Sequence, residues 1–174
     1  ARNKTSFRVT KVTDPEGAGK KILVDNPGAS QTVMYAVHGA GGATADPGQR
    51  AATDVMATVM GGSFTSRLNR RLREELGYTC GARMGVARLP GGGYLRAGGS
   101  MRADATVDAL KELTGLLDAA VDEGVTADEV ARGRAQEITE VVGSAETRAG
   151  LASLYADQLA AGRAPGDLGA WLSA

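Results

Sequence analysis

The first apolar segments of the chain are two short runs separated by a turn. Residues 21–25 (KILVD) and 31–38 (QTVMYAVH) are rich in β-branched and other apolar side chains, and Asn-Pro-Gly at 26–28 lies between them. Runs of this length bounded by turn residues are typical of strands. The residues before them are polar and contain an Asp-Pro pair and two glycines. We therefore predict strands near 21–25 and 31–38, and a linker or peripheral strand over 1–19.

The apolar spacing then changes from that of strands to that of helices. Asp46 followed by Pro47 is typical of a helix N-terminus, with the carboxylate as N-cap and the proline at the first helical position. Apolar residues recur at helical spacing after this pair, until Gly-Gly at 61–62. We predict a helix between these two signals.

A second helix is predicted directly after the Gly-Gly pair. Ser63 is placed to cap it, and Gly77 is placed to end it. Arginines at 67, 70, 71 and 73 then lie mostly away from its apolar stripe. That stripe repeats every four residues and is expected to be buried: Phe64, Leu68, Leu72 and Leu76.

A β-hairpin is predicted next. Residues 78–88 and 93–102 flank a turn of proline and three glycines at 90–93, which is typical of a hairpin with a loose tip. This adds two strands to the two at the start of the chain.

The rest of the chain has a helical pattern. We predict a helix that begins at Asp104 and ends at Gly124. Thr126 and Glu129 have the spacing of a capping box for a further helical stretch, which continues to Gly162. Residues 167–174 are predicted to begin one more helix. The expected buried face of the helix after Asp104 is Val107, Leu110, Leu113, Thr114, Leu117 and Val121.

The order of these elements favours one fold class. Strands come in adjacent pairs rather than alternating with helices, and the chain has no internal repeat. A chain of 174 residues, 43% of them hydrophobic, has the size of one domain with a sizeable core. We predict an α+β two-layer sandwich over residues 20–174, with a mostly antiparallel sheet and helices packed on one face.

Charge and composition argue against some classes of binding partner. Twenty basic and twenty acidic residues cancel, so the chain has no overall field to attract nucleic acid or an anionic membrane. Few aromatic residues are available for base stacking. In the arginine-rich helix, Arg70 can pair with Glu74, and Arg71 with Glu74 or Glu75. Periodicity alone leaves open whether this face is salt-bridged or binds a partner.

Catalytic motifs are missing from the sequence. His38 is the single histidine and Cys80 the single cysteine, which is too few for the three protein ligands of a catalytic zinc. No GxSxG elbow and no phosphate-binding glycine motif is present. We expect His38 to be a strand-end histidine with an ordinary hydrogen bond, and the isolated chain to bind no zinc.

One segment resembles a known family. The string VMGGSFTSRLNRRLREELGYTCGA, with VDNPGASQTVMYAVHG upstream, resembles the second half of the pitrilysin/insulinase family of zinc metallopeptidases. This family includes the mitochondrial processing peptidases and bacterial two-domain peptidases. The resemblance covers residues 20 to about 172. It implies that the chain ends before a further helix and a closing strand.

The resemblance also implies roles for particular residues. In such peptidases one half carries an inverted HxxEH zinc site, and the other contributes an arginine and a tyrosine that hold the substrate backbone. The arginine position corresponds to Arg73, whereas the tyrosine position corresponds to Cys80. Tyr78 lies two residues earlier, on the same face of a regular strand but displaced by roughly 6 to 7 Å. The substrate-binding candidates are therefore Arg73, Tyr78 and Cys80.

By this resemblance the chain is expected to be the non-zinc, substrate-binding half of a metallopeptidase. It would be inactive alone and would need a partner half bearing HxxEH and zinc, in the same chain or in another as a homodimer or heterodimer. The alternative is a non-catalytic structural or interaction module of the same fold, which the missing tyrosine favours. A single cysteine and an N-terminus unlike a signal peptide suggest a cytoplasmic location.

Overall fold

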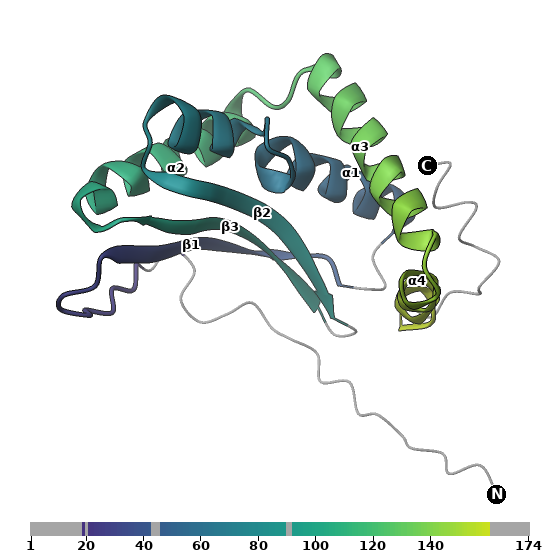
Figure 1. The fold of residues 1–174 in the computed structure, drawn as a ribbon. Coiled ribbons are helices and arrows are strands. Elements are labelled where there is room, and N and C mark those ends of the chain that lie inside the picture. Colours follow the sequence, from purple (N-terminus) through teal and green to yellow (C-terminus); the bar gives the residue numbers. More distant parts are fainter. Residues whose placement is uncertain (1–18, 20, 43–45, 90–91, 161–174) are drawn as a thin grey trace, which may run out of the picture.

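The computed structural model describes residues 19, 21–42, 46–89 and 92–160 (Figure 1). Most of the expected linker at 1–19, the tip of the hairpin at 90–91 and the helix expected at 167–174 lie outside the described residues.

Three strands form one antiparallel sheet in the described part of the chain: β1 (Gln31–Ala40), β2 (Thr79–Leu89) and β3 (Gly92–Arg102). The hairpin strand β3 lies in the middle, in the order β1-β3-β2. Helices α1, α2 and α3 lie on one side of this sheet (Figure 1). The predicted α+β class is therefore confirmed, as are the strands expected near 31–38, 78–88 and 93–102.

The strand predicted at 21–25 is wrong. Residues 21–26 have no regular structure, and Ile22, Leu23 and Val24 are more than 80% exposed. The turn itself is present, with Gly28 at φ +82° and the Ala29 N–H donating to the Asn26 carbonyl over 3.2 Å. A single turn hydrogen bond does not hold an apolar run in a sheet without side-chain packing.

Helices occupy the rest of the described chain. They are α1 (Pro47–Ala57), η1 (Thr58–Gly62), η2 (Asn69–Glu75), η3 (Ala103–Ala105), α2 (Thr106–Asp122), α3 (Ala127–Ala145) and α4 (Arg148–Ala160). The Asp46 carboxylate accepts hydrogen bonds from the N–H groups of residues 48 and 49, as predicted for an N-cap. Thr126 and Glu129 form the predicted capping box. The stretch expected to continue to Gly162 is interrupted at 146–147, where the Thr147 hydroxyl accepts from the Gly150 N–H at the start of α4.

The helix predicted from Ser63 begins later and is wound more widely. Residues 63–66 form turns, helical structure begins at Arg67, and η2 is a π-helix in which the Leu76 N–H donates to the Arg71 carbonyl. Phe64 is consequently 59% exposed, which corrects its expected burial. In an α-helix, a four-residue repeat drifts by about 40° per repeat, and a wider winding reduces that drift. Leu68 and Leu72 are fully buried, as predicted.

The main core lies between the sheet and the helices η2 and α2. Its buried members are Met34, Leu68, Leu72, Ala82, Ala97, Met101, Ala109 and Leu113. The face of α2 that packs here contributes Ala109 and Leu113, and Ala120 farther along the helix is also buried. Val107 and Val121, expected on the buried face, are 65% and 82% exposed. The small alanines face the sheet because they allow the helix to approach it closely, which an apolar pattern alone did not reveal.

Candidate functional site

The segment from η1 to β2 packs directly on the sheet. A Cβ added to Gly61 would lie 2.1 Å from the Met84 backbone nitrogen, so only glycine permits this approach. The close contact places the following turn and η2 over the first half of β2. Packing of this segment on β2 therefore requires glycine at position 61, the first of the Gly-Gly pair.

Asn69 fixes the geometry of the same segment. Its Nδ2 donates to the Ser63 carbonyl over 2.8 Å and lies 3.2 Å from the Ser66 hydroxyl, while its Oδ1 accepts from the Ala82 N–H over 2.8 Å. The side chain is buried, so each bond forms away from competing water. Sequence reasoning missed this residue, although a lone asparagine inside a helix of arginine and leucine is a usable signal.

Arg73 lies at the C-terminal end of η2 and is partly supported. Its guanidinium carbon lies 4.1 Å from the centroid of the Phe64 ring, and its Nε lies 3.3 Å from a carboxylate oxygen of Glu74. The side chain is 35% exposed. The ring covers one face of the guanidinium, while solvent still reaches its donors.

Tyr78 and Cys80 lie in different environments. Tyr78 precedes β2 and packs against the main core, and its carbonyl accepts from the Arg102 N–H over 2.8 Å. Cys80 is exposed on β2, where the register with β3 shifts between Thr79 and Ala82. Regular alternation of side chains along β2 is interrupted by this irregularity. Among the described residues, no hydrogen bond or ring contact joins Arg73 to Tyr78 or Cys80.

Most of the other arginines of this segment are neutralised by carboxylates. Arg67 donates to Glu129 through Nε at 2.8 Å and through a terminal nitrogen at 2.6 Å. Arg71 donates to both oxygens of Glu112 and also to Glu75 at 2.9 Å. The predicted pairing of Arg71 with Glu75 is therefore confirmed.

These ion pairs also shift the acidities of their members. The hydrogen bond from Arg67 is the main reason that the pKa of Glu129 is lowered to about 2. The hydrogen bonds that Arg71 donates to Glu112 and Glu75 raise its own pKa. Arg70, in contrast, lies 3.9 Å from Glu75 and is 70% exposed, and its pairing with Glu74 is not observed. Much of this basic surface is therefore salt-bridged.

The side of the sheet away from the helices contains a hollow of about 420 Å³. Tyr35, Gly98 and Arg83 are paired across the three strands, and the next row is Val37, Arg96 and Gly85. The guanidinium of Arg96 lies over the Tyr35 ring, 4.7 Å from its centroid. We call the surface formed by Tyr35, Val37, Arg83, Tyr94, Arg96 and Gly98 the open sheet face. The sequence reasoning did not find it.

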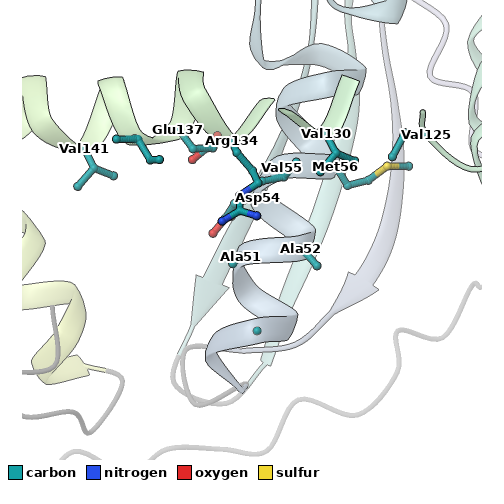
Figure 2. Close-up of a pocket in the computed structure, with 12 residues that line it drawn as sticks. Ala51, Ala52, Asp54, Val55, Met56, Val125, Val130, Arg134, Glu137 and Val141 are labelled. Carbon is teal, nitrogen blue, oxygen red and sulfur yellow. The ribbon is translucent and has the colours of Figure 1, made fainter. Parts of the chain in front are cut away.

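A second pocket, of about 380 Å³, lies between α1 and α3. Figure 2 shows that Val55 and Met56 of α1 and Val130 of α3 form part of its apolar wall. Glu137 at this pocket accepts a short hydrogen bond from the Thr58 hydroxyl, and burial raises the pKa of its carboxyl. The pocket is therefore an apolar depression among the helices, with a carboxyl group held in a poorly hydrated position.

The two residues that could bind a transition metal lie far apart. His38 is exposed near the end of β1 and pairs with Leu95, and its Nδ1 lies 2.6 Å from the Gly39 carbonyl oxygen. Cys80 follows Thr79, which pairs with Met101. The β3 partners of His38 and Thr79 are six residues apart, about 20 Å at the usual rise per residue, and Cys80 is one residue closer than Thr79. Within the described ranges, no three His, Cys, Asp or Glu side chains gather as a metal site, and no helix could cross a membrane.

Comparison with solved structures identifies the fold. The chain is similar to the peptidase M16 inactive domain from Pseudomonas fluorescens, with 20% identity and a TM-score of 0.71, over 83% of this chain and 34% of that chain. A protease from Helicobacter pylori gives 18% identity and a TM-score of 0.70, over 86% and 36%. The inactive peptidase domain of a putative zinc protease from Bordetella parapertussis gives 17% and 0.64, over 82% and 76%.

The chain thus spans about a third of the length of the first two structures. No curated protein matches the sequence significantly. The family model described as the peptidase M16 inactive domain matches residues 2–137, a range that includes η2 and both strands of the hairpin. The resemblance to the non-zinc half of pitrilysin-type peptidases is therefore confirmed, and the chain belongs to the peptidase M16 inactive-domain family.

Proposed function

We propose that this chain is the substrate-binding, non-zinc half of an M16-type metallopeptidase, and that it completes a peptide-cleavage chamber with a half bearing HxxEH. The observation that carries the proposal is the match of residues 2–137 to the inactive-domain family, which includes the helix with Arg73. Such a domain needs a catalytic half, in the same chain or in another.

Arg73 has the chemistry required to hold a peptide carbonyl. A guanidinium is permanently charged and presents several planar donors. Stacking on Phe64 restricts its orientation, and the 35% exposure of its side chain leaves donors accessible to a substrate. Tyr78 and Cys80 complete the proposed substrate-binding set, with Cys80 in place of the tyrosine hydroxyl that the family resemblance implies.

Zinc belongs to the partner half in this proposal. His38 and Cys80 lie too far apart to share an ion, so the residues described in this chain do not fit a catalytic zinc site. The contribution of this chain is limited to binding and orienting the peptide. We also propose a reducing compartment such as the cytoplasm, since the exposed Cys80 is the only cysteine. Recovery of the protein in a periplasmic fraction would contradict that location.

The test uses the chain assembled with its HxxEH-bearing half and a quenched fluorescent peptide. Arg73→Ala should lower kcat/KM by roughly 10- to 1000-fold, the scale of losing one or two charged hydrogen bonds. Arg70→Ala is the matched control, because Arg70 lies on the same helix, is 70% exposed and has only a long ion pair. Cys80→Tyr should leave activity equal or higher. Full activity of Arg73→Ala in an active assembly would refute the substrate-binding role.

The second candidate function is a non-catalytic structural module of the same family. The observation that favours it is Cys80 at the position where the resemblance implies a tyrosine. In that case the chain would assemble with its partner, but Arg73→Ala and Arg70→Ala would have equally small effects on any peptidase activity. Measuring assembly by size-exclusion chromatography beside the cleavage assay separates the two functions.

A further inference from the structure

The charges on the strands are all of one sign. β1, β2 and β3 contain four arginines (Arg83, Arg88, Arg96 and Arg102) and no aspartate or glutamate. Arg88 is paired with Asp54 at 2.7 Å on the helix side, and Arg102 is paired with Asp104. Within the part of the chain that the structure describes, Arg83 and Arg96 have no ion pair. These two cations belong to the open sheet face.

The open sheet face is also shaped to receive a chain. Tyr35 and Arg83 flank Gly98 in one cross-strand row, which leaves a floor without a side chain between two large ones. A Cβ on Gly98 would lie 2.0 Å from the Met34 carbonyl oxygen, so the floor cannot be filled by substitution without moving β1. The resulting hollow has a volume of about 420 Å³, enough for several residues of an extended peptide.

We infer that the open sheet face binds an extended peptide segment with acidic side chains at alternate positions. Arg83 pairs with Gly98, two residues from Arg96 on β3, so the two arginines are diagonal neighbours on adjacent strands. Diagonal neighbours lie roughly 7 to 8 Å apart, and side chains at i and i+2 of an extended peptide are separated by about 6 to 7 Å. A Glu-x-Glu sequence therefore matches the spacing of the two arginine positions on the sheet.

This inference goes beyond the proposed function, because the open sheet face lies on the side of the sheet away from the helices and does not include Arg73. It also distinguishes a peptide from a nucleic acid. Tyr35 and Tyr94 could stack on bases, but a nucleic-acid strand places a phosphate at every nucleotide and usually needs a longer array of cations. Two unpaired arginines on a chain of zero net charge fit a short acidic segment better.

The experiment measures binding of fluorescein-labelled decapeptides to the 174-residue chain by fluorescence anisotropy. A peptide with a central Glu-Ala-Glu is compared with Gln-Ala-Gln and Lys-Ala-Lys peptides of otherwise neutral sequence. We expect the glutamate peptide to bind about 10-fold more tightly than the glutamine peptide, with the difference decreasing in high salt. The arginines are exposed, so each of Arg83→Gln and Arg96→Gln should weaken glutamate-peptide binding by only about 3- to 10-fold.

Matched variants separate this surface from other basic groups. The double variant of Arg83 and Arg96 should bind glutamate and glutamine peptides equally, whereas Arg70→Gln, on η2, should keep the full preference. Circular dichroism of each variant checks folding. Equal binding of the two peptides by the wild-type chain, no peptide binding, or an unchanged preference in the folded double variant would overturn the inference. Tighter binding of an oligothymidine, lost in the double variant, would assign the face to nucleic acid instead.

The result is distinguishable from a failure of the proposed function. Arg73→Ala should retain the preference for the glutamate peptide, because Arg73 lies on η2 and is not part of the open sheet face. If the preference is found but no assembly with an HxxEH half cleaves peptides, the surface assignment holds and the proposed function fails. If the assembly cleaves peptides but the chain shows no preference for the glutamate peptide in the anisotropy assay, only the inference fails.

Discussion

Glu129 joins two parts of the fold through a single carboxylate. It accepts two hydrogen bonds from Arg67 at the start of the η2 segment and one from the Thr126 N–H at 2.8 Å in the capping box of α3. We predict that Glu129→Gln destabilises the protein at pH 7. Glutamine can still close the capping box, so the substitution isolates the loss of the ion pair with Arg67.

The size of the effect follows from the acidity of this group. A pKa lowered from 4.5 to about 2 corresponds to roughly 3 kcal/mol of stability at neutral pH, since each unit is worth about 1.4 kcal/mol. The side chains of Arg67 and Glu129 are 17% and 18% exposed, so screening by solvent reduces this value. We expect a loss of about 1.5 to 2.5 kcal/mol in the free energy of unfolding.

The pH dependence has a definite sign. Because the folded-state pKa of Glu129 lies below the unfolded value, its contribution is complete well above pH 4.5 and is lost as the pH falls toward 2. Urea unfolding at pH 7 and pH 3 should therefore show that the difference between wild type and Glu129→Gln falls to about half or less at the lower pH. A difference below about 0.5 kcal/mol at pH 7, or one equal at both pH values, would refute the reasoning.

The adjacent residue provides a control. Asp128 also pairs with an arginine, Arg132, but the two side chains are 81% and 67% exposed. Exposed pairs within one helix contribute little, so Asp128→Asn should change the stability by no more than about 0.5 kcal/mol.

Three further predictions concern packing and burial. Asn69→Ala should destabilise the protein by about 2 to 3 kcal/mol, because it leaves a buried backbone N–H of β2 unpaired; a loss under 1 kcal/mol in urea unfolding would contradict this. Gly61→Ala should destabilise the protein by about 3 kcal/mol or more, because the added Cβ clashes with Met84. Gly115→Ala is the control: open space surrounds Gly115, so this change should be neutral or stabilising by up to about 1 kcal/mol. Equal melting temperatures for the two variants would argue against the clash. Burial raises the pKa of Glu137, so its carboxylate disfavours the folded state as the pH rises through that pKa. The melting temperature of Glu137→Gln relative to wild type should therefore increase from pH 4 to pH 8, and a pH-independent difference would contradict this.

The sequence by itself determined those elements whose signals are local. The capping box of Thr126 and Glu129 and the N-cap at Asp46 are formed by residues within three positions of each other, so their interactions do not depend on the rest of the fold. The hairpin strands β2 and β3 are likewise adjacent in sequence. The family was also recognisable from the string around η2, because it is a continuous motif.

The tertiary structure decided everything that depends on contacts between distant segments. The run at 21–25 has a strand composition, but no strand pairs with it in the described residues, and Phe64 is exposed because η2 begins after it and winds widely. Arg67 and Arg71 find their principal partners on other helices, at Glu129 and Glu112.

The open sheet face shows the same dependence on long-range pairing. Tyr35, Arg83 and Arg96 lie on three different strands, and only the β1-β3-β2 order brings their side chains to one surface. Periodicity indicates which residues of a strand share a side, but it does not say which strand will lie beside it or which side the helices will cover. That choice is made by the packing of the small residues Gly61, Ala82 and Ala109 between sheet and helices, and it leaves the arginines on the uncovered side.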